Sequence, residues 1–395
     1  MARDIPFIPR FYIDHFQFLK HSGIVGMFSL DNDKFSMKED EAVTTTPILE
    51  TQFNNLFDYN PVNQGIFPYY SLGGSNQINE GEVEITLPTG NISTQDWDGN
   101  WYIASLGHNH YNSFTEIYAK FTSVGDEAIS YQERANTTEI INSSSTNTYN
   151  GFSIEKFTDK PIDNDYSKYI TIGIKSRENN QAQLTDINLG AISLGKYFDL
   201  SISSDVKMSM EYQFGVKTKK SKSGSHLSNM EWWQKPSWGN HPAWELNNDL
   251  DVNYQNKVNE DLGWRKSGRR VYDLAFTFLS SDEVLATSGV LDGTTLEGNQ
   301  FDGDTSGELT DSTAEGSSAT VSNTSNPINI KNDHSIFAQI VHKTMGFQLP
   351  FIFQPNKDYA KPDGFMFARI AEKSYELEQL ADNLWRCKFK IEEMW

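Results

Sequence analysis

Residues 383–395 read NLWRCKFKIEEMW, and this closing stretch indicates the fold class of the chain. Apolar and basic side chains alternate along it. The apolar ones are Trp385, Cys387, Phe389 and Ile391, and the basic ones are Arg386, Lys388 and Lys390. A period of two is typical of a β-strand that buries one face. Because chain ends are usually polar and frayed, we expect this segment to be held inside a sheet.

Further strand candidates precede the closing segment and predict a mainly β protein. They are segments 11–19 (FYIDHFQFL), 82–86, 100–106, 115–122, 168–176, 189–198 and 271–279. Strands at this spacing, without helical periods between them, favour a β-sandwich of the jelly-roll kind before residue 200. In segment 271–279 the residues expected on one face are Tyr272, Leu274, Phe276 and Phe278.

One convincing helix is predicted, and it follows residue 332. Asn332 or Asp333 can cap its first turn, and Gly346 can end it. Its expected shared face consists of Ile336, Phe337, Ile340, Val341 and Thr344. After this helix the sequence predicts three more strands, of which the closing segment is the last.

The charge balance limits the classes of partner. The chain has 33 Lys and Arg against 53 Asp and Glu, a net charge of −20. An acidic protein is a poor ligand for phosphates, so we expect no sequence-specific nucleic-acid partner. Between Arg270 and Lys331 there is no Lys or Arg but ten Asp and Glu, which is typical of an extended loop.

Cellular location and covalent structure are also constrained by the sequence. The single cysteine, Cys387, rules out a disulfide framework and is expected as a small core residue. No segment approaches the ~18–20 consecutive apolar residues of a membrane span. The N-terminal residues lack the apolar core of a secretion signal. We therefore expect no membrane span and synthesis in a cytoplasm.

The C-terminal part resembles the minor tail proteins of tailed bacteriophages, which relate to the distal tail protein that joins tail tube to tip. The resemblance is carried by the segments GRRVYDLAFTFLSSDE (268–283), LPFIFQP (349–355) and FMFARI (365–370), with the closing strand. The matching residues are Gly224, Arg270, Tyr272, Leu274, Phe276, Phe353, Pro355, Phe389, Glu392 and Glu393. The pattern is one of strands and turns, and none of these residues is catalytic.

This resemblance implies a small β-sandwich whose copies form a ring around the tail axis of a virion, with tail tube, hub and fibre proteins as partners. It also implies that the closing strand packs against a neighbouring subunit. The acidic insertion at 285–331 is longer than in the family, and the jelly-roll segment lies before the tail-type domain. Both departures leave the number of copies in the ring open.

The middle region is similar to galactose-binding-like, discoidin-type jelly rolls, on the segment NWYIASLGHNHYN (100–112) and the later segment LGAISLGKYFDL (189–200). Together the two resemblances imply four regions. An N-terminal strand and loop (1–48) join the tail-type β-sandwich (201–286 and 332–395), the jelly roll occupies 49–200, and the acidic loop occupies 287–331.

A sugar site and a metal site are both candidates near residue 100. Aromatic and polar side chains that can stack on or bind a sugar are Trp97, Trp101, Tyr102, His108, Asn109 and Tyr111, with packing in the core as the alternative. His108 and Asn109 can instead satisfy backbone groups of the turn. Oxygen ligands for Ca²⁺ alternate at Asp96, Asp98 and Asn100, but Gly107 stands where a Ca²⁺-binding loop has Glu, which favours a plain turn. No other cofactor is expected.

Candidate assembly residues are aromatic and basic. They are Lys219, Lys220, Trp232, Trp233, Arg269, Arg270, Trp385 and Trp395. The basic clusters can dock the acidic loop of a neighbouring copy, or they can form a solvated sheet rim. Exposed tryptophans are costly without a partner, which makes them candidate interface anchors.

No catalytic motif is present, and we expect no enzyme activity. The sequence has no Gly-x-Ser-x-Gly, phosphate-binding loop or His-Glu-x-x-His motif. A structural protein of a phage tail tip is therefore the preferred hypothesis. A glycan-binding adhesin of the same virion is the alternative. A tail-associated polysaccharide depolymerase comes third, because abundant carboxylates can supply a glycosidase pair.

Overall fold

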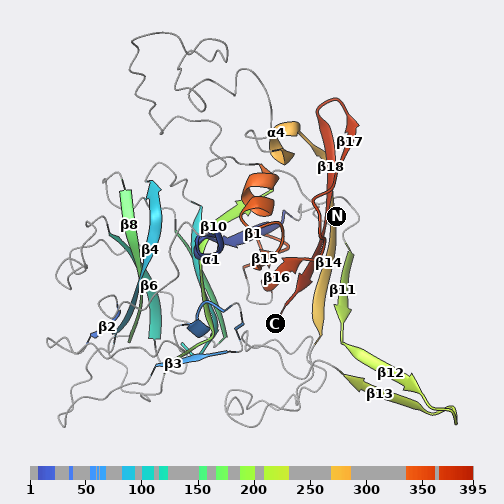
Figure 1. Cartoon of the computed structure of the whole chain (residues 1–395), viewed down its shortest axis with the longest axis horizontal. Helices are drawn as coiled ribbons and strands as arrows, with labels where there is room; N and C mark the ends of the chain where they lie inside the picture. Colours follow the sequence, from blue (N-terminus) through green and yellow to red (C-terminus); the bar gives the residue numbers. More distant parts are fainter. Residues whose placement is uncertain are drawn as a thin grey trace, which may run out of the picture.

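The computed structural model describes residues 8–22, 35–38, 54–58, 60–61, 63–67, 82–93, 100–110, 115–122, 151–157, 166–176, 187–200, 209–230, 268–285, 335–360 and 364–394. Within them the protein is mainly β, as the sequence predicts, and is consistent with a β-sandwich class (Figure 1). Every strand pairing among these residues is antiparallel.

A ten-stranded sheet organises the molecule, in the order β11-β14-β18-β16-β15-β1-β10-β5-β7, with β17 paired to β18. Its strands are β1 (Arg10–Asp14), β5 (Trp101–His108), β7 (Gly151–Phe157), β10 (Ala191–Asp199), β11 (Ser209–Gln213), β14 (Arg269–Leu279), β15 (Phe351–Gln354), β16 (Met366–Ile370), β17 (Leu377–Ala381) and β18 (Leu384–Glu393). Strands from the start, middle and end of the chain thus share one layer.

Three smaller sheets and three helical segments complete the described structure. The order β2-β4-β8-β6 joins β2 (Phe35–Lys38), β4 (Glu82–Ser93), β6 (Thr115–Thr122) and β8 (Tyr166–Ser176). Two further sheets have two strands each. One joins β3 (Gly65–Phe67) to β9 (Ile187–Leu189), and the other joins β12 (Val216–Lys220) to β13 (His226–Met230). The helical segments are α1 (His15–Ser22), α4 (Ser281–Val284) and the π-helix η7 (Phe337–His342).

The large sheet crosses the boundary expected near residue 200. Strand β10, in the expected jelly roll, pairs with β1 from Arg10↔Asp199 to Asp14↔Gly195. Strand β1 in turn pairs with β15 of the expected tail-type domain. The two expected β-sandwiches therefore share a sheet here. The strands β2, β4, β6 and β8 form their own sheet, drawn to the left of the large one in Figure 1.

Both faces of the large sheet are buried at its centre, where β1 lies. On one face Phe11 packs against Phe353, with ring centroids 5.2 Å apart. On the other face Tyr12 meets Tyr102 edge-on, at 5.0 Å. The first face carries the larger hydrophobic cluster, which also includes residues of β14, β18 and η7. All five residues of β1 are consequently buried.

The closing segment forms β18, which is held in place by other strands of the same chain. Cys387, Phe389 and Ile391 are buried, as the alternation predicts, and Trp385 is half-buried. Strand β14 pairs with one edge of β18, and β17 and β16 pair with the other. The chain's own strands thus hold this end, and no neighbouring subunit is needed to explain why it is buried.

Two expected strands differ in the structure. Segment 11–19 forms a strand only as far as Asp14, whose carboxylate accepts the Gln17 N–H at 3.0 Å and starts α1. Strand β14 contains a bulge between Thr277 and Leu279. At the bulge Phe278 adopts φ 72° and is 70% exposed, so Leu279, which is fully buried, takes the inward place expected for Phe278.

The expected helix is present as the π-helix η7. Within the described residues the capping oxygen is Ser335 Oγ, which accepts the Ala338 N–H at 3.2 Å. Asn332 and Asp333 lie outside the described residues. Gly346, with φ 67°, donates its N–H to Val341 O at 2.8 Å and ends the helical turn, as the sequence predicts.

Candidate functional site

The aromatic residues predicted to bind sugar lie in the core where they are described. Trp101 and Tyr102 have no exposed surface. The hydroxyl of Tyr102 shares a 2.8 Å hydrogen bond with Ser193, and Lys196 Nζ lies 5.6 Å from the centre of the Trp101 ring. Their rings present no face to a ligand, because they pack as core residues. Trp97 and Tyr111 lie outside the described residues, so their contact with sugar stays a prediction.

His108 and Asn109 fix a turn. The His108 ring is buried, its Nδ1 accepts the His110 N–H at 3.2 Å, and its Nε2 lies 2.8 Å from Ser153 Oγ. The ring of His110 stacks on it at 4.1 Å. Burial, then the nearby His110, lowers the pKa of His108 well below its usual value. Asn109 Oδ1 accepts the Asn188 N–H at 2.9 Å, so this pair has the turn-forming role offered as the alternative.

The predicted calcium ligands are only partly described. Asp96 and Asp98 lie outside the described residues. Asn100 is exposed, and its backbone oxygen accepts the Tyr197 N–H at 2.8 Å. Among the residues that the structure describes, no group of three His, Cys, Asp or Glu side chains is placed to hold a metal ion. The calcium site stays a prediction.

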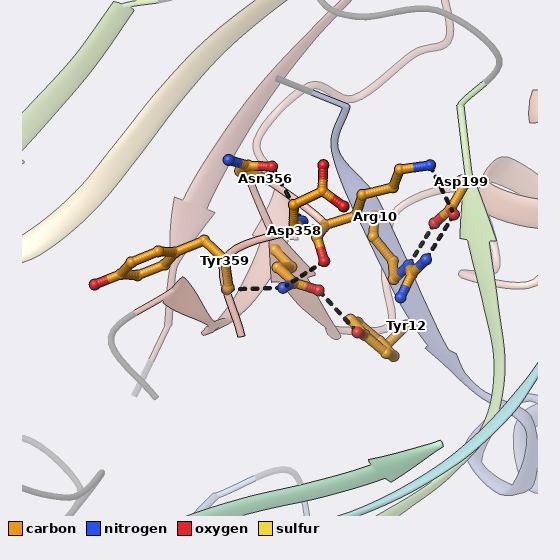
Figure 2. A network of polar contacts seen from close by, with 8 residues as sticks. Arg10, Tyr12, Asp199, Asn356, Asp358 and Tyr359 are labelled. Atoms are coloured by element: carbon orange, nitrogen blue, oxygen red, sulfur yellow. Dashed lines mark hydrogen bonds and ion pairs between the residues drawn. The ribbon is translucent and has the colours of Figure 1, made fainter. Parts of the chain in front are cut away.

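A polar network joins β1, β10 and the turn after β15, and no sequence pattern indicates it. Arg10 pairs with Asp199 through two hydrogen bonds, one of them 2.7 Å, and Lys357 Nζ lies 3.9 Å from the same carboxylate. Tyr12 donates to Gln354 at 2.8 Å, and Gln354 donates to the Tyr359 carbonyl at 2.9 Å. Figure 2 shows these residues meeting across three strands. The network ties the sheet's centre together.

The electrostatics of this network favour its charged, bonded form. Burial disfavours the charged guanidinium of Arg10, but hydrogen bonds to Asp199 and Tyr12 outweigh it and raise the pKa of Arg10. Burial raises the pKa of Tyr12, which keeps its hydroxyl protonated as a donor. The guanidinium also stacks 4.2 Å from the centre of the Tyr197 ring. Because each of these groups already has a partner, the network serves the structure, and we call the contact of Arg10 with Asp199 and its neighbours Tyr12, Tyr197 and Gln354 the latch.

A cavity of about 350 Å³ adjoins the latch. Its polar lining comes from Asn100, Lys196, Asp199, Glu283 and Gln339, and its apolar lining includes Phe198, Leu200, Leu279 and Ile336. Several of the polar groups already have structural partners. Asp199 binds Arg10, Glu283 accepts the Ser280 N–H at 2.7 Å, and Gln339 accepts from Lys343 at 2.6 Å.

Three of the predicted assembly residues are interior or half-buried, and two of these, Arg270 and Trp385, make contacts that hold the fold. The Arg270 side chain is 5% exposed and pairs with Glu393 at 2.8 Å, and it also donates to the Phe365 carbonyl at 2.7 Å. Burial opposes its charge, but the attraction of Glu393 outweighs this and raises the pKa of Arg270. Trp385 is half-buried and donates to Ser281 Oγ at 2.8 Å. In this structure both residues hold the fold instead of facing a partner.

Lys219 and Lys220 lie on a surface that can meet a partner, which we call the basic hairpin (residues 216–230). Its strands β12 and β13 pair from Val216↔Met230 to Lys220↔His226 and extend away from the large sheet (Figure 1). Every described side chain in it is exposed except the half-buried Ser221. Arg269, at the nearby start of β14, is half-buried. Trp232, Trp233 and Trp395 lie outside the described residues.

The conformation of the hairpin is fixed by hydrogen bonds at its tip and by glycines at its tip and base. At its tip Ser221 N–H donates to Ser225 O at 2.8 Å, and Gly224 N–H donates to Ser221 O at 3.0 Å. Gly224 has φ 89°, a conformation that glycine adopts without strain. At its base, a Cβ on Gly268 would lie 2.9 Å from the Phe214 ring, so the absence of a side chain lets that ring pack closely.

Comparison with known proteins finds no matching family model, no similar curated protein and no similar solved structure. In the described part of the chain, no helix combines the length and apolar character needed to cross a membrane. The function must therefore be inferred from the surface and the core of this chain.

Proposed function

We propose that the chain is a structural component of a bacteriophage tail, a distal-tail or tail-tip protein that assembles with copies of itself and with other tail proteins. The observation that carries the proposal is the basic hairpin. An isolated two-stranded hairpin is at best marginally stable in water. A hairpin with a hydrogen-bonded tip and exposed side chains on both strands is what a protein needs when part of its sheet structure contacts another molecule.

The arrangement of the residues that carry the resemblance to minor tail proteins supports the assignment to a tail. Arg270 and Glu393 form the buried ion pair between β14 and β18. Tyr272 and Phe353 meet at 5.8 Å between ring centroids. These residues are far apart in sequence yet form one packed unit, as the resemblance implies for a compact β-sandwich.

The mechanism we propose is mechanical. Antiparallel strands with both faces packed resist deformation, because core packing is dense and backbone hydrogen bonds run across the whole layer. The ten-stranded sheet would serve as the rigid body, and exposed loops and the basic hairpin would hold neighbours in the virion.

The proposal is tested on virions. Mass spectrometry of purified tailed particles that encode this chain should find its peptides in fixed ratio to other tail proteins. Immunogold electron microscopy with antibodies to the purified chain should label one end of the tail. Particles that lack the chain, or label only on capsids, would overturn the assignment.

The alternative is a host-surface glycan-binding adhesin of the virion, and the cavity of about 350 Å³ favours it. A cavity lined partly by polar and partly by apolar groups suits the two kinds of surface on a sugar. The test is a glycan array with the whole chain, because β5 and β10 are paired into a sheet with β1 and would be incomplete alone. Specific, saturable binding that is lost with Gln339→Leu would favour the adhesin.

A further inference from the structure

The basic hairpin concentrates positive charge on an acidic protein. It contains Lys217, Lys219, Lys220 and Lys222 and no Asp or Glu, so its formal charge is +4. The whole chain carries −20, which leaves −20 − 4 = −24 on everything outside the hairpin. Within the described residues no ion pair involves Lys219, Lys220 or Lys222. The charge of the hairpin is therefore opposite to that of the body, by which we mean all residues outside 216–230, and the body of a second copy offers the same opposite charge.

The same segment exposes apolar surface. Val216 is 54% exposed and Leu227 is 65% exposed. Because Leu227 is paired with Lys219, three residues after Val216, the two apolar side chains lie on opposite faces of the hairpin. Strand β11, which leads into the hairpin, lies at the edge of the large sheet and exposes Met210. Exposed apolar side chains next to lysines are typical of an interface whose centre is desolvated and whose rim is charged.

We propose that the basic hairpin of one copy docks on the acidic body of a second copy, in a head-to-tail contact. This inference rests on the proposed function and names the partner for its assembly surface. A twofold contact through the hairpins would bring the lysines of two copies together, and like charges in apposition are unfavourable. The hairpin must then meet a different surface of its neighbour. Such heterologous contacts close into rings or continue as filaments.

Screening lets this contact form despite the net charge of each copy. At physiological ionic strength the Debye length is about 8 Å, so repulsion between whole bodies is largely screened while contacting charges still attract. At about 1 M salt the Debye length falls to about 3 Å, and the attraction weakens as well. Self-association should therefore decrease between these two salt concentrations.

The test compares two variants of equal charge by sedimentation velocity over a concentration series. One is Lys219→Glu/Lys220→Glu in the hairpin. The matched control is Lys373→Glu/Lys388→Glu, at exposed lysines outside it. The wild type and the control should form the same species, larger than a dimer. The association of the hairpin variant should be weaker by a factor of at least about ten, because attraction becomes repulsion at two positions. Circular dichroism should show the same fold in all three.

Cross-linking identifies the contact directly. A carbodiimide joins lysine amines to carboxylates, and the hairpin has no carboxylate of its own. In a mixture of isotopically light and heavy copies, mixed-isotope links should join Lys219, Lys220 or Lys222 to Asp or Glu outside the hairpin of the other copy. A wild type that remains monomeric, a hairpin variant with wild-type mass, or a dimer joined hairpin to hairpin would each overturn the proposal.

These outcomes are separate from those that test the tail assignment. Association through the hairpin by a chain absent from virions would refute only the proposed function. Presence in the tail without self-association through the hairpin would refute only the head-to-tail contact, and the hairpin's partner would then be another tail protein.

Discussion

Strand β18 and the basic hairpin use the same antiparallel pairing in opposite surroundings. Strand β18 is paired on both edges, and its alternate apolar side chains are buried. In the described part of the chain the hairpin pairs only with itself, and its described side chains are exposed except that of Ser221. Charge follows the same division, since Glu393 of β18 has a buried partner whereas the hairpin lysines are exposed. Backbone pairing is therefore common to both. What differs is the burial of the side chains, which distinguishes β18, which holds the fold, from the hairpin, which is available to a partner.

Removing residues 386–395 should have the largest effect. The deletion takes out most of β18, leaves β14 and β16 without their shared neighbour, and opens the cluster around Phe276 and Phe353. Because these losses exceed the ~5–15 kcal/mol by which a typical domain is stable, we expect an insoluble chain without a cooperative thermal transition by calorimetry.

The matched control for this deletion replaces residues 216–230 with two glycines. Val216 and Met230 are opposite each other in the hairpin, so a short link can join its ends. This variant should keep the thermal transition. A truncated chain that melts like the wild type would contradict the view that β18 holds the sheet.

Glu393→Ala should be the next most damaging change. It leaves the Arg270 guanidinium charged in a buried site without its carboxylate, which costs about 3–5 kcal/mol. The matched control is Glu378→Ala, which removes the exposed pair of Glu378 with Arg386 at 3.4 Å and should cost about 0–1 kcal/mol. Urea unfolding monitored by tryptophan fluorescence measures both. Equal losses of unfolding free energy in the two variants would show that burial does not make the Arg270–Glu393 pair more important than the exposed pair.

Protonation of His108 should give a smaller, pH-dependent effect. Its pKa is lowered in the folded state, so below the ordinary value of 6.5 the unfolded chain binds a proton that the folded chain does not. Stability contributed by neutral His108 is therefore present above that pH and is lost as the pH falls from 6.5, by up to about 1.4 kcal/mol per unit.

The comparison for this effect is His108→Asn against His226→Gln, which changes an exposed residue of the hairpin. Urea midpoints at pH 7.5 and 5.5 should differ less for His108→Asn than for the wild type, because one of the titrating groups has gone. They should keep the wild-type difference for His226→Gln. An unchanged difference in His108→Asn would mean that another group sets the pH dependence.

The sequence predicts the local elements well because their signals are local. Alternation at Cys387, Phe389 and Ile391 is enough to find β18, and Gly346 is enough to end η7. The latch of Arg10 with Asp199 joins residues 189 positions apart, and nothing in either neighbourhood indicates the other. The aromatic residues near position 100 were ambiguous for a related reason, since a ring that suits a sugar also suits a core.

Bulges limit such predictions in another way. An extra residue in β14 reverses the face of the residue after it, so Phe278 becomes exposed and Leu279 buried. The exposure of the hairpin is also not evident from the sequence, because it depends on what packs against the two strands. The lysine cluster was visible in the sequence, and the structure adds that it stands outside the core.

Leu227→Ser should have the smallest effect on stability. Leu227 is exposed, so the unfolding free energy should change by less than about 0.5 kcal/mol, whereas Leu274→Ala, inside β14, should cost about 2–5 kcal/mol. Both should be measured in urea at about 1 M salt, where screening weakens charge-mediated association. At physiological salt Leu227→Ser should still reduce self-association, because the leucine would be buried on docking. A large loss of stability would instead mean that the hairpin packs against its own chain, and the contrast with β18 would then fail.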